Sequence, residues 1–286
     1  MGRINIMSGG VSSRLVAGVF LAVAGSMPVH ATEAGRVGPP LWEVGAFALG
    51  VTQQAYPGSD TQLKRALALP YVVYRGQWLR ADQETVGLRA LKTERVELDL
   101  GLAGSFGGGG DEIEARDGMR ELGTLVELGP RLKLALGAGP GGGRWRADFP
   151  LRGVFDLSDR GSYRGLAFEP RLLFERRSAG GWRYGTSLSV IVADRRLAED
   201  FYGVGPQDAT PWRPAYVARG GLVATRLSLS ASRSLGRDWQ LFGFARLESV
   251  QGAANEASPL VRKKGGVSAG LGVAYTWRRS QAQARD

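Results

Sequence analysis

Paired carboxylates are the side chains of this sequence whose type and spacing could most directly do chemistry. Glu97 with Asp99, and Glu169 with Glu175, could supply the acid and base of a glycoside hydrolase, a reaction that needs no histidine. Basic residues occupy the same faces of neighbouring stretches, and carboxylates that face cations across strands form structural ion pairs. We therefore predict ion pairs at these positions and no enzymatic activity.

Two further patterns have the spacing of a binding motif without its context. The G-x-G-x-x-G pattern at 137–142 matches the dinucleotide fingerprint, but no helix follows it, which indicates a glycine-rich turn. An acidic run in a polar loop could offer oxygen ligands to a divalent cation: Asp111, Glu112, Glu114 and Asp117. Such runs are commonly solvated, so we predict no metal and no cofactor.

The N-terminus has the three parts of a cleaved signal peptide. Arg3 and Arg14 supply the basic region, residues 15–25 form a short apolar stretch, and Val29-His30-Ala31 is a small-x-small cleavage site. Residues 1–31 are therefore predicted to be removed, so that the mature chain begins at Thr32. Removal takes away the only histidine of a chain without cysteine. Histidine-assisted nucleophiles and histidine-ligated zinc are then excluded.

The stretch 265–277 alternates strictly between two kinds of side chain. Val267, Leu271 and Trp277 belong to the apolar set, and small or polar residues make up the other set. A period of two indicates a strand with one apolar face. Its length suits a strand that crosses a bilayer at a tilt, with about 9–11 residues in lipid. We predict that 265–277 is the last strand of a transmembrane β-barrel.

The same alternation recurs along the mature chain and predicts twelve strands. They lie at about 41–53, 64–75, 77–82, 85–91, 95–106, 124–136, 144–156, 166–174, 182–192, 223–232, 239–250 and 265–277. An even count puts both chain ends on one side, where the connections are short, and the long connections lie on the other side. The predicted fold is all-β: one antiparallel up-and-down barrel over 32–286, with a tail at 278–286. Ten strands would result if the pair at 77–91 does not form.

Two features of these strands need structural explanation. Pro130 and Pro170 lie inside predicted strands, where a proline removes a hydrogen-bond donor, and β-bulges could accommodate them. The strand at 64–75 has an apolar face that contains Leu67, Leu69 and Tyr71. In a membrane barrel, apolar faces are expected to meet lipid.

The opposite faces carry charges of both signs on strand after strand, unlike the packed apolar interior of a soluble barrel. Cross-strand ion pairs between them would fill and stiffen the lumen, and a net positive excess would favour anionic solutes if a path exists. The candidate lumen charges are Glu97, Asp99, Glu127, Arg131, Lys133, Arg146, Asp148, Arg152, Glu169, Arg171, Arg183, Arg226, Arg246 and Glu248. The basic residues at 262–264 could meet lipopolysaccharide phosphates. No nucleic-acid partner is expected for an exported barrel, despite the formal charge of +10.

Four short stretches in the predicted loops carry a family resemblance. They are 56–60 (YPGSD), 200–204 (DFYGV), 213–216 (RPAY) and 258–261 (SPLV), in this order along the chain. In these stretches the sequence resembles the MipA/OmpV family of outer-membrane proteins (MltA-interacting protein). The candidate residues that the resemblance marks are Tyr56, Pro57, Gly58, Asp60, Phe201, Tyr202, Gly203, Pro214, Tyr216, Ser258 and Pro259. Family members tend to end at an aromatic residue, whereas this chain continues past Trp277.

The resemblance implies a barrel in the outer membrane of a Gram-negative bacterium. For the founding member it implies a scaffold that brings a murein-degrading lytic transglycosylase together with a murein-synthesising penicillin-binding protein. Other members are described as porin-like or as adhesins, so a narrow channel for small or anionic solutes and a surface adhesin are the alternatives. A periplasmic partner would have to use the short turns, residues 32–40 or the basic tail that begins at Arg278. The motif-bearing loops are expected to pack the barrel entrance.

Overall fold

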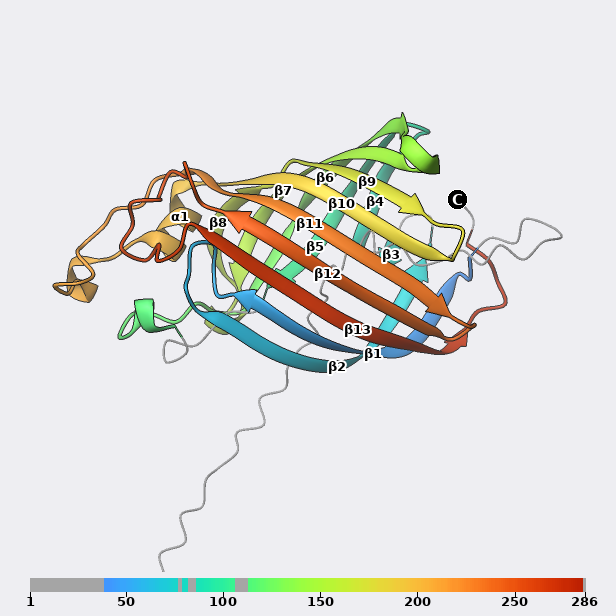
Figure 1. The fold of residues 1–286 in the computed structure, drawn as a ribbon, viewed down its shortest axis with the longest axis horizontal. Coiled ribbons are helices and arrows are strands. Elements are labelled where there is room, and N and C mark those ends of the chain that lie inside the picture. Colours follow the sequence, from blue (N-terminus) through green and yellow to red (C-terminus); the bar gives the residue numbers. More distant parts are fainter. Residues whose placement is uncertain (1–38, 77–78, 82–85, 106–112, 285–286) are drawn as a thin grey trace, which may run out of the picture.

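The computed structural model of the protein describes residues 39–76, 79–81, 86–105 and 113–284. The predicted signal peptide lies outside the described residues, as do Asp111 and Glu112 of the acidic run. A single β-sheet dominates the described chain (Figure 1). Within that part, no helix combines the length and the apolar character that crossing a membrane would require.

Thirteen strand segments form one antiparallel sheet that closes on itself. They are β1 (Trp42–Gln54), β2 (Gln62–Arg75), β3 (Leu79–Ala81), β4 (Val86–Lys92), β5 (Val96–Ser105), β6 (Leu125–Ala138), β7 (Arg144–Asp156), β8 (Ser162–Phe168), β9 (Arg171–Arg177), β10 (Trp182–Ala193), β11 (Gly221–Leu235), β12 (Trp239–Ser249) and β13 (Gly265–Arg279). Apart from β8 and β9, which do not pair with each other, each segment pairs with its neighbours in the chain, and β13 pairs with β1 to close the barrel. The predicted all-β, antiparallel barrel fold is confirmed.

The strand count is twelve, because β8 and β9 are two parts of one interrupted strand. Both segments pair with β7 on one side and with β10 on the other. The pair at 77–91, which decided between ten and twelve, exists as β3 and β4. It is short, since β3 joins β2 only at Tyr74–Ala81 and Arg75–Arg80.

The two prolines are accommodated in different ways, and neither lies at a bulge. Pro130 stays inside β6, opposite Leu100 of β5. The preceding Gly129 has room for no side chain, because a Cβ there would collide with the backbone oxygen of Leu151 in β7. Pro170 instead lies between two segments, because β8 ends at Phe168 and β9 begins at Arg171. The irregularity between β6 and β7 lies further along, between Ala135 and Gly137.

The outward faces are apolar, with Leu271 66 % exposed on β13. One expectation is wrong: the apolar face of β2 that contains Leu67 and Tyr71 points into the lumen. Tyr71 is buried, whereas Val72 and Tyr74 beside it are exposed on the outer surface. Both faces of β2 are apolar, so the alternation could not decide which one meets lipid.

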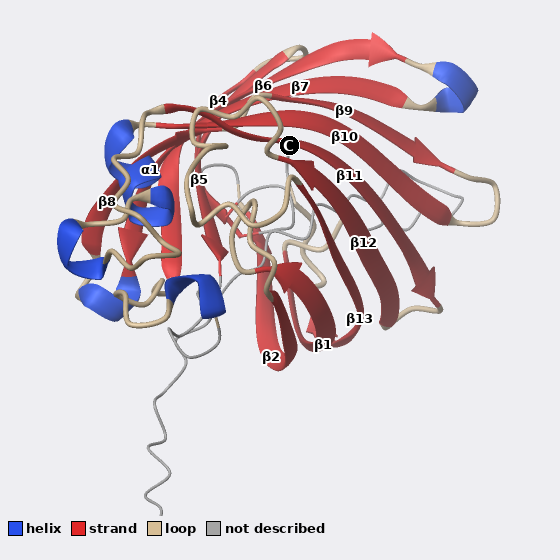
Figure 2. Ribbon diagram, turned by 60° about the vertical axis from the view of Figure 1, so that its left-hand side comes forward, coloured by secondary structure: helices blue, strands red, loops and turns tan. Residues whose placement is uncertain are grey.

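The two ends of the barrel differ. The terminal end, which carries residues 39 and 284 at the two ends of the described chain, has short connections, and the loop end carries the long ones (Figures 1 and 2). The last strand continues to Arg279, beyond the expected Trp277. The tail then folds back, because the backbone N–H of Leu41 donates to the oxygen of Ala282 at 2.9 Å and that of Ala284 donates to Pro39 at 2.8 Å.

Candidate functional site

The long loops pack together at the loop end and form a second hydrophobic core. Segments 55–61, 113–124, 194–220 and 250–264, which we call the loop cap, bury side chains from all four segments, among them Tyr56, Ile113, Tyr202 and Leu260. These segments join strands on different sides of the barrel. Contacts between them therefore bridge the loop-end mouth, as Figure 2 shows from the side on which α1 lies.

Hydrogen bonds between motif-bearing loops hold this core together. The Tyr56 hydroxyl donates to the oxygen of Leu260 at 2.8 Å, and the Tyr202 hydroxyl donates to Pro57 at 2.9 Å. The Ser258 hydroxyl donates to the oxygen of Tyr202 at 2.7 Å. The first, third and fourth segments of the loop cap are thereby joined through residues that the family resemblance marks.

The other marked residues lie around these three. Gly58 is buried at a positive φ of 93°, and its oxygen accepts from the N–H groups of Arg262 and Lys263. Gly203 ends α1, and Phe201 and Tyr216 pack at the edge of the core. Pro259 and Pro57 are half-buried, whereas Asp60 and Pro214 are exposed. The resemblance thus marks a packed cluster and two residues at its surface.

Sequence reasoning missed the polar side chains that connect the loops. Arg213 is buried and donates to the backbone oxygens of Asp208, Ala115 and Asp117, which ties the second segment to the third. Asn255 bonds both the N–H and the oxygen of Arg219 at 2.8 Å. Buried polar groups of this kind serve backbone groups that no strand pairs. Their role depends on loop contacts far apart in sequence, which the alternation pattern does not contain.

A helix lies inside the stretch that the sequence suggested was an irregular loop. α1 (Arg195–Tyr202) begins after Asp194, whose side chain accepts from the N–H of Leu197 at 2.8 Å as an N-cap. Leu197, Ala198 and Tyr202 are buried on its inner side. α1 packs against β8 at Gly165, where a Cβ would come within 2.6 Å of the Leu197 nitrogen. The short spacing of these apolar residues was the only feature of the sequence from which this helix could have been predicted.

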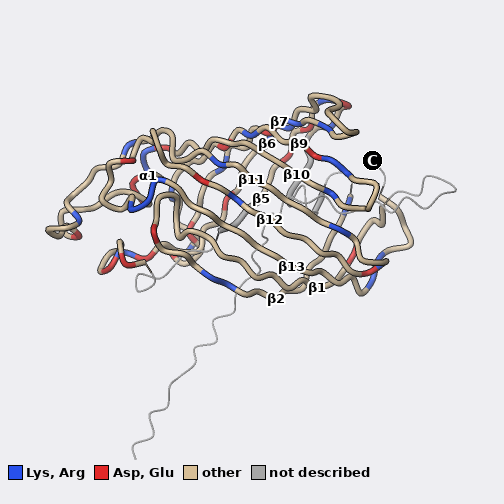
Figure 3. Tube along the Cα trace, viewed as in Figure 1, with Lys and Arg blue, Asp and Glu red and all other residues tan. Residues whose placement is uncertain are grey.

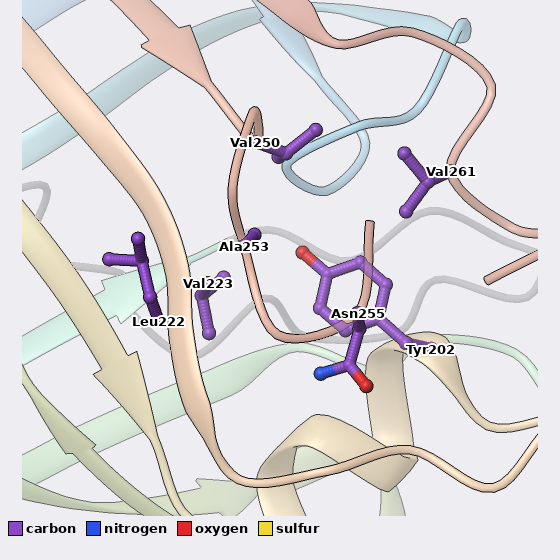
Figure 4. A pocket seen from close by; sticks show the side chains of 7 residues that line it. All are labelled: Tyr202, Leu222, Val223, Val250, Ala253, Asn255 and Val261. Atoms are coloured by element: carbon purple, nitrogen blue, oxygen red, sulfur yellow. The ribbon is translucent and has the colours of Figure 1, made fainter. Parts of the chain in front are cut away.

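A narrow apolar crevice remains in the loop cap beside the Tyr202 ring (Figure 4). Its walls come from α1, the start of β11 and the 250–264 segment, and they consist of Tyr202, Leu222, Val223, Val250, Ala253, Asn255 and Val261. Burial raises the pKa of Tyr202, and it raises the pKa of Tyr56 to about 12. Both phenols therefore remain neutral hydrogen-bond donors in the loop cap at physiological pH.

The lumen charges form connected ion pairs on the β5–β12 side of the barrel. Asp99 is fully buried between Arg131 and Lys133, each at 2.8 Å, and Lys133 also reaches Glu97 at 3.0 Å. This arrangement follows from register, since Asp99 lies opposite Arg131 and Glu97 lies opposite Lys133.

A second chain of ion pairs runs from β6 to β12. Arg226 contacts Glu248 at 2.6 Å and Glu169 at 2.9 Å, and Arg152 links Glu169 to Glu127. Glu169 lies in the break between β8 and β9, where its backbone N–H donates to the oxygen of Pro150 in β7 at 3.2 Å. The interruption at Pro170 thus places one carboxylate between two arginines.

A third group surrounds Asp148, which Arg146 contacts at 3.0 Å and Arg171 at 3.4 Å. Arg146 also lies 3.7 Å from Glu175. Among the described residues, twelve of the fourteen candidate lumen charges lie in these three groups of ion pairs, whereas Arg246 has no carboxylate within 4.0 Å. Both candidate carboxylate pairs are engaged with cations, which is an arrangement suited to structure.

The other side of the lumen is mostly apolar, apart from Arg65 and the ion pair between Arg75 and Glu43. Phe47, Leu67 and Leu69 on β1 and β2, with Phe242 and Phe244 on β12, face inward and are half-buried. The inner face of β13 between them is nearly bare of side chains, because a Cβ at Gly270 or Gly272 would come within 2.5 Å of a phenylalanine ring. The lumen wall is thus divided lengthwise into a charged part and an apolar part.

The terminal end carries a strong excess of positive charge (Figure 3). The described residues there include two exposed acids, Glu94 and Asp238. The exposed bases, which we call the terminal rim, are Lys92, Arg95, Arg144, Arg176, Arg177, Arg233, Arg237 and Arg278. Some of them are held in place: Arg233 lies over the Trp182 ring at 5.7 Å.

Comparisons with known proteins fit this geometry. A family model described as MltA-interacting protein MipA matches residues 44–277. No curated protein matches the chain. Among solved structures, the chain is similar to the NanC porin at 11% identity and a TM-score of 0.39, over 80% of this chain and 98% of that chain. It is also similar to a bacterial polysaccharide outer membrane secretin (11% identity, TM-score 0.42, 82% and 99%) and to an outer membrane channel from Pseudomonas putida F1 (12%, 0.37, 88% and 100%).

Proposed function

This chain belongs to the MltA-interacting protein MipA family, and on this premise we propose that it is a non-enzymatic docking platform for murein enzymes. It is an outer-membrane β-barrel of a Gram-negative bacterium. The partners are a lytic transglycosylase, which degrades murein, and a penicillin-binding protein, which synthesises it. Bacterial barrels place short turns in the periplasm, so the terminal end is the periplasmic end. Docking then takes place on the terminal rim.

The observation that carries this proposal is the charge of the terminal rim. Its exposed bases outnumber the exposed acids among the described residues of that end. A surface of one sign attracts a partner of the other sign and raises the rate of association. The expected partner surface is therefore acidic. The loop end, by contrast, mixes both signs in ion pairs such as Arg120 with Asp200 and Lys264 with Glu256.

The tail after β13 is an ordered part of the terminal end and not a flexible extension. Its hydrogen bonds to residues 39–42 extend the pairing of β13 with β1 beyond the wall. Arg279 donates to Asp238 at 3.0 Å and to the oxygen of Arg237 at 2.8 Å, which fixes the turn beside it. A pre-ordered surface loses less conformational entropy on binding than a flexible one.

The loop cap and the ion-paired lumen support docking over open transport. A wide channel needs a continuous polar path, and here one mouth is bridged by packed loops. Most of the candidate lumen charges are paired with each other rather than presented to a solute. We therefore rank the narrow channel second.

Charge reversal on the terminal rim tests the proposal. The double variant Arg237→Glu with Arg278→Glu should weaken binding to the purified lytic transglycosylase of the same bacterium at least tenfold, measured on the barrel in nanodiscs at low salt. The matched control is Arg262→Glu with Lys263→Glu, which makes the same charge change at the loop end and should bind like the wild type. Equal affinities of all three proteins would refute docking on the terminal rim.

A further inference from the structure

Two cations border the apolar part of the lumen wall, Arg246 of β12 and Arg65 of β2. Arg65 shares a cross-strand row with Phe244 and donates to the backbone oxygen of Lys64 at 3.2 Å. Arg246 is the one considered for a ligand, because Arg65 already has a partner.

Arg246 follows Phe244 and Phe242 along the inner face of β12. Its guanidinium carbon lies 4.9 Å from the centre of the Phe244 ring. Across the sheet it lies opposite Ser228 of β11 and Ser268 of β13, whose side chains are small.

The carboxylates nearest in register already have partners. Glu248, one inward position further along β12, contacts Arg226 at 2.6 Å, and Glu169 is shared by Arg226 and Arg152. Within the described residues, no carboxylate lies within 4.0 Å of Arg246. A guanidinium without an acidic partner inside a protein is suited to bind a carboxylate or phosphate through two parallel hydrogen bonds.

The apolar side chains lie below Arg246, towards the terminal end. Leu67, Leu49, Gly272 and Phe242 share one cross-strand row, and Phe244 belongs to the next row. From Phe242 to Arg246 the strand rises about 13 Å. Half-exposed apolar side chains that face away from lipid offer a surface to an apolar molecule inside the lumen.

We propose that the lumen binds an amphipathic monoanion, a medium-chain alkyl carboxylate, with its carboxylate on Arg246 and its chain along the Phe244, Phe242 and Leu67 side. The loop cap covers the far mouth, so the ligand enters from the terminal end. Charge and position agree in this assignment, because Arg246 lies at one end of the apolar strip and the charges next to it, Glu248 and Arg226, are paired with each other.

Decanoate and decanol are the probes that test this assignment, since they share a chain and differ in charge. Each is titrated against a fluorescent alkyl carboxylate bound to the folded barrel in nanodiscs. Arg246→Met should lower the affinity for decanoate about tenfold or more, because a charge-assisted hydrogen bond is lost. The affinity for decanol should not change. Phe242→Ser should weaken both probes. Arg246→Lys, which keeps the charge, should retain part of the preference for decanoate.

Arg262→Met, a cation at the loop end, is the matched control and should bind both probes like the wild type. Equal decanoate affinity of the wild type and Arg246→Met would overturn the assignment. So would a decanoate affinity that Phe242→Ser leaves unchanged. If Arg246→Met fails to fold, the pH dependence of decanoate binding to the wild type provides the test. Decanoate should bind less tightly below the pKa of its carboxyl group, where it is protonated and uncharged. Equal affinity for the charged and the protonated form would contradict the proposal.

Discussion

Asp99 shows how single side chains determine the interior of this barrel. Alternation predicts that Glu97, Asp99, Arg131 and Lys133 face inward, because every second residue of a strand lies on the same face. It does not predict which acid meets which base. That depends on the register of β5 against β6, which joins residues about thirty positions apart. The ionic character of the lumen was therefore predictable from sequence, and its pairing was not.

Removing the charge of Asp99 should strongly destabilise the barrel. Asp99→Asn leaves Arg131 and Lys133 buried without their shared anion, which costs about 3–5 kcal/mol. Denaturant unfolding in detergent micelles measures this cost. Glu175→Gln is the control, because Glu175 is partly exposed and 3.7 Å from Arg146, and it should cost less than about 1 kcal/mol. Equal costs for the two variants would contradict the role of the buried cluster.

The loop cap should loosen at alkaline pH. Burial raises the pKa of Tyr56 from 10.0 to about 12, so folding favours the neutral phenol. The contribution of this phenol to stability is complete below pH 10 and is lost as the pH rises through about 12. In a tyrosinate absorbance titration, Tyr56→Phe should lack an ionisation near pH 12. A missing step near pH 10 would show that Tyr56 is not buried in the loop cap.

At the scale of elements, the loop cap is a small domain built from connections. The sequence pattern predicted long loops in the right places, because long polar stretches separate the strands at one end only. It did not predict α1, since eight residues are too few for a clear helical period. The resemblance-marked residues Tyr56, Tyr202 and Ser258 lie where the loops meet. Packing of the entrance, expected for these loops, agrees with this geometry.

A side chain at Gly165 should detach α1 without unfolding the barrel. Gly165 has a φ of 139°, and an added Cβ would collide with the beginning of α1. Gly165→Ala should therefore make 194–220 much more sensitive to limited proteolysis, while the strands keep their resistance. Gly50→Ala, at a position on the outer wall with no atom within 4 Å of the added Cβ, should digest like the wild type. Unchanged protection in Gly165→Ala would show that α1 does not depend on this contact.

For the molecule as a whole, the sequence is sufficient to predict the barrel fold but not the arrangement of side chains in the lumen. Short turns, long loops and recurring alternation suffice for a twelve-stranded barrel. The division of the lumen into charged and apolar parts was missed, because β2 is apolar on both faces and either orientation satisfies the pattern. Of the terminal rim, only Arg278 was foreseen, as the start of the basic tail. Its other members lie in or beside the short turns, which the fold places together at one end of the barrel.

As a whole, the wild-type barrel should conduct ions poorly. Packed loops bridge one mouth and ion pairs line part of the lumen wall, so planar bilayers should show no steady openings with the folded protein. Replacing residues 196–216 with a short glycine–serine linker should produce stable openings, because that segment supplies α1 and Arg213 to the loop cap. Steady ohmic openings of the wild type with anion preference would make transport its primary role.

Photo-crosslinking in living cells tests docking on the terminal rim most directly. A benzoylphenylalanine is introduced at Arg237, on the terminal rim, or at Arg262, at the loop end. The account predicts that Arg237→benzoylphenylalanine captures the lytic transglycosylase or the penicillin-binding protein and that the loop-end variant captures neither. Capture at Arg262 alone, or capture of neither enzyme by a folded barrel at Arg237, would contradict the account.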